Sequence, residues 1–567
     1  MSSISDNGKS NNPLGRPPGA GRGHGRMALR GRQVDPAALA EVRQILGAAT
    51  VERTLLVEYL HQIQDTEGCL RHRHLAALAH CLRLSLAEVY EVATFYHRFD
   101  VVPDEAKPAA RTIHICDGLP CQMAGADALA NELANDLAAK EGDNCRIIRS
   151  ACMGRCDGAP VASVGAEHYL IHADATAIQN RLSGPIAPDV AAPVVDFAGY
   201  QADGGYQLLR QCLAGERRID QVITQLEESG LRGLGGAGFP TGRKWRLVAA
   251  ERGPRLLAVN GDESEPGTFK DRHYLETDPH RFIEGMLLAA WAMDAADIYI
   301  YLRDEYPHLR ALLQRELAIV TTAGLCQRQI HLRRGAGAYI CGEESAMLES
   351  IEGKRGLPRQ RPPFPSQVGL FGQPTLINNV ETLYWARDAI NGGANWEHMR
   401  SFSVSGRVRE PGVKRVPAGI SARALIDGHC GGMAAGHELV AFLPGGASGG
   451  ILPARLADEA MDFGTLEQHG ALIGSAGLIV LSQHDDIGAV VANLMRFFAH
   501  ESCGQCTPCR VGTEKAVTML AAGKAAADDV AFADLAQVMA DASICGLGHA
   551  AANPLRCALR YFPGSIA

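Results

Sequence analysis

Three cysteines separated by two-residue gaps constrain this chain more than any other stretch of its sequence. The stretch "ESCGQCTPCRVG" covers residues 501–512 and places Cys503, Cys506 and Cys509 directly after a run with a helical apolar stripe. A C-x2-C-x2-C run lets three thiolates converge on one metal centre without backbone strain. We expect the fourth ligand from Cys545, in the glycine-flanked turn "SICGLG". Four crowded thiolates favour a [4Fe-4S] cluster, with a zinc site as the alternative.

Two further cysteine pairs lie in a segment that alternates predicted strands with a helix. Cys116 is the last residue of "RTIHIC" and Cys121 lies in the loop that follows, while Cys152 and Cys156 lie in the loop after "CRIIRS". Because each pair stands where a strand runs into a loop, the two loops are expected to face each other across a [2Fe-2S] cluster. The spacings weaken a zinc-ribbon interpretation, and a thioredoxin-type dithiol requires C-x-x-C at a helix start. Cys145 is predicted to be structural.

Length and charge limit the class of protein. A chain of 567 residues is too long for one core, so about three to five domains are expected. The net charge of -8 gives no support for nucleic acid as a main partner. No run reaches the ~18 apolar residues of a membrane span. We expect a cytoplasmic protein without such a span, in which the sixteen cysteines are metal ligands and buried thiols rather than disulfides.

Apolar periodicity and turn residues divide the chain into seven segments. The predicted segments are a disordered tail at 1–36, a helical bundle at 37–108, a small α/β domain at 109–185, a Pro/Ala-rich linker at 186–204, a larger α/β domain at 205–398, a small mixed β domain at 399–485 and a second helical bundle at 486–567. Arginines of the tail are candidates for contact with RNA or an acidic partner, or the tail is a solvated leader. Ser85 and Glu88 predict a capping box before a helix.

The larger α/β domain contains a glycine loop, "GLRGLGGAGFPTGRKW". Its glycines include Gly233, Gly235, Gly236 and Gly238, and Lys244 follows closely. The residues before the loop read as helix rather than strand, so it is not a regular dinucleotide fingerprint. Its backbone N–H groups can nevertheless cradle a phosphate. Taken alone, a structural turn is the alternative.

Two more polar loops and an Asn-Asn pair strengthen a cofactor prediction. "VNGDESEPGTFKD" follows a predicted strand, at the carboxyl edge where open α/β sheets bind ligands. "GAGAYICGEES" and "INNVET" follow later in the domain. Each acidic cluster alone is typical of a solvated loop, but together they favour a cofactor pocket. The candidate residues are Asn260, Asp262, Glu263, Glu265, Tyr339, Gly342, Glu343, Glu344, Asn378 and Asn379.

These motifs together resemble the FMN-binding NADH dehydrogenase subunit of respiratory complex I and its soluble relatives. The resemblance covers about residues 205–567 through the loops above, "GKRGLPRQRPPFP" and "ESCGQCTPCRVG". The first cysteine unit resembles the neighbouring [2Fe-2S] subunit of the same module, here fused ahead of the flavin part. The resemblance implies an α/β multidomain chain: a helical bundle, a thioredoxin-like [2Fe-2S] domain, a Rossmann-like FMN domain, a β-grasp domain and a carboxy-terminal helical bundle with a [4Fe-4S] cluster.

The resemblance also implies roles for the loop residues. The residues implied to line the FMN are those of the glycine loop, Lys244, Asn260, Asp262, Tyr339, Glu343, Asn378 and Asn379. Phe239 and Phe364 match aromatics that stack on the nicotinamide nucleotide, and Glu263 and Glu265 would lie by its sugar hydroxyls. Leu234 stands where complex I members usually have arginine ("GRGGAGFPTG"). Hydride transfer requires mainly stacking and orientation, so no catalytic acid or base is predicted.

The implied activity is that of an NAD-dependent oxidoreductase, a diaphorase in which a flavin links two-electron and one-electron carriers. Acidic residues by the ribose favour NAD over NADP. The intact first cysteine set and the similarity of "GLGGAGFPTGRKW" favour the β subunit of a formate dehydrogenase, whose large partner subunit holds a Mo/W pterin cofactor and further iron-sulfur clusters. The alternatives are the diaphorase subunit of an NAD-reducing hydrogenase, the NADH-input subunit of complex I, and a zinc-binding scaffold without redox turnover.

Overall fold

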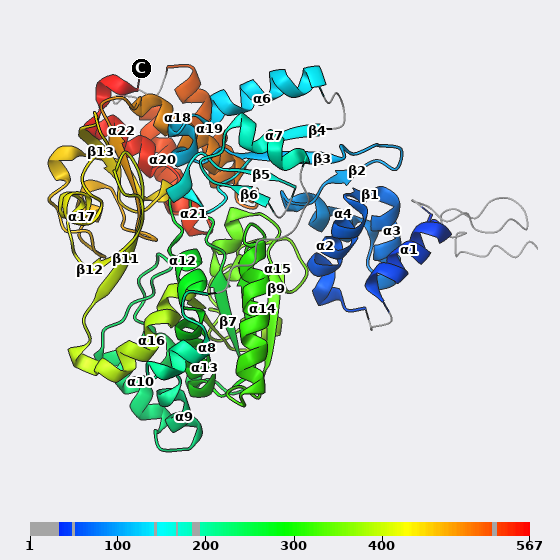
Figure 1. Cartoon of the computed structure of the whole chain (residues 1–567), viewed down its shortest axis with the longest axis vertical. Helices are drawn as coiled ribbons and strands as arrows, with labels where there is room; N and C mark the ends of the chain where they lie inside the picture. The colour runs from blue at the N-terminus through cyan, green and yellow to red at the C-terminus, as the bar shows by residue number, and fades with distance from the viewer. Residues whose placement is uncertain are drawn as a thin grey trace, which may run out of the picture.

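The computed structural model describes residues 33–47, 51–140, 145–165, 168–183, 193–523 and 530–566. Most of the predicted tail and residues 186–192 of the predicted linker lie outside these ranges. Figure 1 shows the described parts as neighbouring units, with the amino-terminal helices and the mixed β domain on opposite sides of the unit that contains β7 (Arg255–Gly261) and β9 (Gln329–Arg334).

The amino-terminal unit is a small helical bundle. Its helices are α1 (Pro36–Leu46), α2 (Leu56–Glu67), α3 (His72–Leu82) and α4 (Leu86–Phe95), and β1 (Leu70–Arg71) pairs in parallel with β2 (Val101–Val102). The predicted capping box is confirmed: Ser85 accepts from the Glu88 N–H while the Glu88 side chain accepts from the Ser85 N–H. This box fixes the start of α4.

The next unit has the expected thioredoxin-like topology. Its elements are β3 (Arg111–Cys116), α5 (Leu119–Met123), α6 (Ala126–Lys140), β4 (Cys145–Ser150), β5 (Ala162–Val164), β6 (His168–Leu170) and α7 (Ala175–Ser183). The sheet order is β4-β3-β5-β6, with β3 and β4 parallel and the other pairs antiparallel. Both cysteine pairs therefore leave the same end of neighbouring strands.

The central unit is built on a four-stranded parallel sheet. Its strands are β7 (Arg255–Gly261), β8 (Ala295–Leu302), β9 (Gln329–Arg334) and β10 (Thr375–Asn379), in the order β10-β7-β8-β9. Its helices are α8 (Phe197–Ala202), α9 (Gln207–Leu213), α10 (Ile219–Glu228), α11 (Thr241–Ala249), α12 (Lys270–Thr277), α13 (Pro279–Ala292), α14 (Pro307–Thr322), α15 (Glu344–Ile351) and α16 (Val380–Gly392).

Apolar residues on both faces of this sheet explain its burial. Leu257 and Val259 of β7 pack into the core cluster that contains α13 and α16, whereas Leu256 and Ala258 pack into the cluster on the opposite face. Continuous apolar runs of this kind are typical of parallel strands covered on both sides. The strand order reverses between β7 and β10, and such a switch point is where open α/β sheets bind ligands.

The last two units are a mixed β domain and a helical bundle. The β domain contains β11 (Met399–Gly406), β12 (Gly412–Pro417), α17 (Ala422–His429), β13 (Leu439–Leu443), β14 (Leu452–Pro453) and β15 (Gly477–Ser482). The central pair β11 and β15 is parallel, flanked by antiparallel strands as in a β-grasp fold. The bundle contains α18 (Ile487–His500), α19 (Thr507–Ala521), α20 (Val530–Ala542), α21 (Gly546–Ala550) and α22 (Asn553–Tyr561). Within the described ranges no helix has the length and apolarity needed to cross a bilayer.

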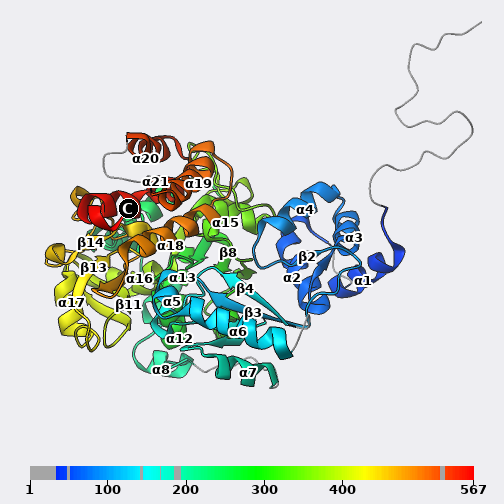
Figure 2. The same cartoon turned by 90° about the horizontal axis from the view of Figure 1, so that it is seen from above.

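The amino-terminal bundle lies beside the central unit (Figure 2) and contacts it where β9 ends. His61 Nε2 donates to the Gly335 carbonyl at 2.9 Å, and Arg98 pairs with Asp304 at 2.9 Å. The buried Tyr96 hydroxyl lies 2.9 Å from the Ser350 hydroxyl. The His61 contact, together with the N–H groups of His97 and Arg98 that donate to Gly337 and Ala336, holds the loop that follows β9.

Acidification is expected to release this bundle. Burial lowers the pKa of His61 from 6.5 to about 3, so the docked ring stays neutral while an undocked ring titrates at the ordinary value. The docked state thus binds fewer protons between those two values, and docking weakens as the pH falls from 6.5 toward 3. Hydrogen exchange of α2 across this range measures the effect. His61→Gln should flatten the dependence, and an unchanged slope in that variant would contradict the assignment to His61.

Candidate redox site

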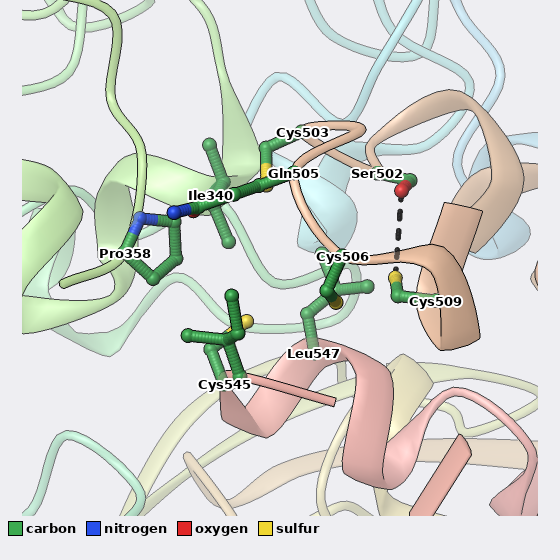
Figure 3. Close-up of a pocket in the computed structure, with 10 residues that line it drawn as sticks. Ile340, Pro358, Ser502, Cys503, Gln505, Cys506, Cys509, Cys545 and Leu547 are labelled. Atoms are coloured by element: carbon green, nitrogen blue, oxygen red, sulfur yellow. Dashed lines mark hydrogen bonds between the residues drawn. The ribbon is translucent and has the colours of Figure 1, made fainter. Parts of the chain in front are cut away.

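The four predicted ligands of the [4Fe-4S] cluster line one small cavity. Cys503, Cys506, Cys509 and Cys545 surround it together with apolar side chains, which include Ile340, Pro358 and Leu547. Figure 3 shows Cys503 and Cys545 on opposite sides of the cavity, contributed by segments about forty residues apart in the chain. The Cys509 Sγ lies 3.4 Å from the Ser502 hydroxyl. The structure therefore brings the sequence-distant Cys545 to the C-x2-C-x2-C run.

Helix starts place two of these thiols. Cys506 is the N-cap of α19 and Cys545 is the N-cap of α21, so both lie where free backbone N–H groups favour negative charge. Burial nevertheless raises the pKa of Cys545 to about 12 and that of Cys509 to about 11. Without added positive charge these thiols stay protonated. A donor set of this kind fits a metal centre, which supplies that charge.

The other quartet is also assembled, and it is more deeply buried. Cys152 Sγ lies 3.4 Å from Cys156 Sγ, and the Gly154 N–H points to Cys152 Sγ at 3.4 Å. Contacts with the thiols of Cys121 and Cys152, together with burial, raise the pKa of Cys116. Phe269 of the central unit packs on Cys152 and Cys156. Four buried thiols linked by these contacts fit a [2Fe-2S] centre.

Two of the three asparagines expected at the flavin lie side by side at the switch point. In the parallel pairing of β10 with β7, Asn379 stands opposite Asn260. The Asn260 side-chain amide donates to the Gly342 carbonyl at 2.8 Å, and the Asn379 amide donates to Asp271 at 2.6 Å. Asn378 accepts from the Trp245 indole N–H at 2.9 Å. The carboxyl edge of the sheet therefore carries a fixed row of amides.

The glycine loop lies against this row, between α10 and α11. A Cβ atom at Gly235 would approach the Asn379 Cβ to 3.0 Å, and Gly236 and Gly238 have φ of 121° and 65°. Only glycine allows this close approach and these backbone angles without strain. Gly233 closes the loop by donating to the Phe239 carbonyl at 2.8 Å. The loop fits the cradle that an FMN phosphate requires.

The acidic loop that follows β7, residues 262–269, meets the loop after β9 at the same edge of the sheet. Lys244 pairs with Glu344 at 3.0 Å, and Glu343 caps α15 through the Ser345 and Ala346 N–H groups. Tyr339 donates its hydroxyl to Glu265, which also accepts from the Ser448 N–H at 2.7 Å. The predicted residues from separate loops are thus brought together.

Three predicted residues have surroundings that the sequence did not indicate. Glu263 is buried and accepts from the Asp271 N–H, the Arg272 N–H and the Tyr306 hydroxyl, so it caps α12. Burial raises the pKa of Asp262 to about 8. Leu234, at the position where complex I members usually have arginine, is 7% exposed and packs in the core of the central unit.

The two aromatics expected at the nucleotide are among the exposed large apolar side chains. Phe239 is 42% exposed and Phe364 is 51% exposed. The Arg243 guanidinium lies 5.9 Å from the centre of the Phe239 ring. Exposed aromatic faces are available for stacking on a planar ligand.

A buried charge cluster lies beside the carboxyl edge of the sheet, and the sequence did not predict it. Lys270 is 1% exposed and pairs with Asp271 at 2.9 Å and with Glu381 at 3.1 Å. Asp271 in turn accepts from Asn379. "TFKDR" reads as a solvated charged run, and its partner Glu381 lies far along the chain. No local signal reveals such a cluster.

Comparison with known proteins matches three parts of the chain to family models. Residues 42–182 match the thioredoxin-like [2Fe-2S] ferredoxin model, residues 226–386 the Nuo51 FMN-binding domain, and residues 489–567 the NADH-ubiquinone oxidoreductase-F iron-sulfur binding region. An NADH-quinone oxidoreductase F subunit of Rhizobium meliloti (strain 1021) is 41% identical over 386 residues, which cover 64% of this chain and 91% of that protein. The mitochondrial NADH dehydrogenase [ubiquinone] flavoprotein 1 of Dictyostelium discoideum is 40% identical, with 61% and 78% covered.

A crystal structure of an NAD+-reducing [NiFe]-hydrogenase in the H2-reduced state contains a chain that is 33% identical, with a TM-score of 0.80, and the match covers 91% of this chain and 93% of that one. The fold class predicted from the sequence is confirmed, and the cofactors of the chain are FMN, a [2Fe-2S] cluster, a [4Fe-4S] cluster and NAD. The chain belongs to the family of NADH-quinone oxidoreductase F subunits, with a thioredoxin-like [2Fe-2S] domain fused ahead of the FMN-binding and [4Fe-4S] regions.

Proposed function

We propose that this oxidoreductase subunit exchanges electrons between NAD(H) and a partner subunit that oxidises formate at a Mo/W pterin cofactor. The chain would then be the β subunit of an NAD-dependent formate dehydrogenase. Support comes from the complete quartet of Cys116, Cys121, Cys152 and Cys156 and from the sequence of the glycine loop. The cytoplasmic location and the domain limits expected from the sequence remain predictions.

One observation carries the electron-transfer part of this proposal: both cysteine quartets are tied to the same edge of the central sheet. The Tyr339 N–H donates to Glu501 at 3.0 Å, and Glu501 precedes the [4Fe-4S] ligands by two positions. On the other side, Arg303 donates to the carbonyls of Glu263 and of Cys152. FMN bound at this edge would supply the conversion between two-electron and one-electron transfer.

The chain's own residues would hold and orient the ligands. We propose that the eight predicted cysteines bind the two clusters and that the loops at the sheet edge bind FMN. Phe239 and Phe364 would stack on the nicotinamide nucleotide, with Glu265 near its sugars. For Glu263 to play the same role, its carboxylate must accept a hydrogen bond from the nucleotide in addition to the three that it accepts from the protein.

A hydrogenase partner is the second candidate, and a specific observation favours it. The hydrogenase chain matches 91% of this chain, whereas the quinone oxidoreductase F subunits cover 61–64% of it. The fused architecture therefore occurs in a chain of an NAD+-reducing hydrogenase. The complex I alternative lacks that full-length match among the relatives named above.

Affinity purification of the tagged chain under anaerobic conditions tests the partner. Copurification of a large subunit with molybdenum or tungsten, together with formate-dependent NAD+ reduction, is the expected result. Nickel and hydrogen-dependent NAD+ reduction would assign the second candidate. A colourless preparation with stoichiometric zinc would point to the non-redox scaffold instead.

A further inference from the structure

A buried arginine joins the flavin sheet to the ligand loop of the [2Fe-2S] quartet. Arg303 directly follows β8 and is 4% exposed. Its two Nη groups donate to the main-chain carbonyls of Cys152 and Glu263, and its Nε donates to the Glu305 carboxylate at 3.1 Å. Because all three guanidinium nitrogens have partners, the cation has one fixed position.

The surroundings hold the same loop by its main chain. The Arg272 Nε donates to the Gly154 carbonyl at 3.0 Å. The Arg303 guanidinium lies 5.1 Å from the centre of the Tyr306 ring, and a Cβ atom at Gly154 would come within 2.1 Å of the Tyr306 hydroxyl. Hydrogen bonds therefore hold residues 152–154 against the central unit, and the close approach of Tyr306 leaves no space for a side chain at Gly154.

A fixed cation here acts on the redox equilibrium of the neighbouring centre. Reduction adds one negative charge to an iron-sulfur cluster, and buried charges are screened much less than exposed ones. The Arg303 guanidinium contacts the main chain of a ligand cysteine, whereas the compensating Glu305 carboxylate contacts the Nε of the guanidinium. The cation thus contacts the ligand loop directly, and the hydrogen bond of the Glu305 carboxylate is made to the cation.

We propose that Arg303 is a positioning residue for the [2Fe-2S] cluster, which fixes the Cys152 loop against the flavin sheet and raises the reduction potential of that cluster. This inference rests on the cysteine assignment made under the proposed function. It assigns to a residue of the flavin domain the control of a centre in a different domain.

An EPR-monitored redox titration of the cluster-loaded chain tests the inference. In Arg303→Met, which lacks the cation and its donors, the ratio of reduced to oxidised cluster at a fixed potential should fall about tenfold, which is about 59 mV for one electron. Arg303→Lys keeps the charge and should shift less. Arg255→Met is the matched control, because Arg255 also donates to main-chain carbonyls but lies at the amino end of β7. It should leave the potential unchanged.

Glu305→Gln supplies the test of sign and does not depend on the stability of Arg303→Met. Removal of the anion should raise the potential, whereas general loosening of the junction would not shift the two variants in opposite directions. If the cluster of Arg303→Met keeps the wild-type reduction potential, or if that of Glu305→Gln is lowered, this inference is overturned and the cysteine assignment is not affected. A wild-type chain without a reducible [2Fe-2S] centre overturns the cysteine assignment and this inference with it.

Discussion

Cys545→Ser is expected to leave reduction of the flavin by NADH intact and to reduce onward electron transfer to the level of cluster-free protein. Cys545 closes the cavity from the start of α21, on the side opposite Cys503. A serine hydroxyl is a much poorer iron ligand than a thiolate, so the remaining three cysteines should not retain a complete [4Fe-4S] cluster. Stopped-flow bleaching of the flavin measures the first step, and EPR of the reduced protein measures the cluster.

Cys557→Ser is the matched control for this prediction. Cys557 is also buried, but its Sγ donates to the Gly470 carbonyl at 3.2 Å, and a serine hydroxyl can replace that donor. The control should keep both the cluster and onward transfer. Partner-linked activity in Cys545→Ser would show that a different residue completes the cluster.

Lys270→Met is expected to destabilise the flavin edge strongly. The substitution leaves the buried carboxylates of Asp271 and Glu381 without their common cation. Breaking a buried pair in this way costs about 3–5 kcal/mol. Hydrogen exchange in α12 and α16 measures the local opening, and the FMN content should fall as well because Asp271 holds the Asn379 side chain.

Arg423→Met provides the comparison for an exposed ion pair. Arg423 pairs with Asp458 at 3.0 Å, and both side chains are exposed to solvent. Such pairs contribute about 0–1 kcal/mol, so exchange in this variant should hardly change. Wild-type exchange rates and full FMN content in Lys270→Met would mean that the buried carboxylates are neutralised by other groups.

The local motifs were predictable because each carries its chemistry in a few adjacent residues. The gaps between Cys503, Cys506 and Cys509 predict that these thiols converge, and they line one cavity; Ser85 with Glu88 fixes a helix start. The glycine loop was correctly placed after a helix, where α10 ends. Short-range geometry of this kind can be inferred without knowing the rest of the fold.

The contacts between domains were not predictable from the sequence. Arg303 and Tyr306 read as parts of an ordinary charged turn, yet both contact the main chain of residues 152–154. Residues 193–204 were expected to be linker, but they include α8, whose buried Tyr200 bonds Glu284 at 2.6 Å. Such contacts depend on how folded domains pack against each other, and no local sequence pattern encodes that packing.

The loop at residues 335–339 contacts both the amino-terminal bundle and the carboxy-terminal bundle. The N–H groups of His97 and Arg98 donate to the carbonyls of Gly337 and Ala336, and two residues later the Tyr339 N–H donates to Glu501. The amino-terminal bundle and the carboxy-terminal bundle therefore hold the same loop from two sides. A chain that begins after the amino-terminal bundle would lose the hydrogen bonds from His97 and Arg98 to this loop, even though it would still contain every residue predicted to bind the flavin.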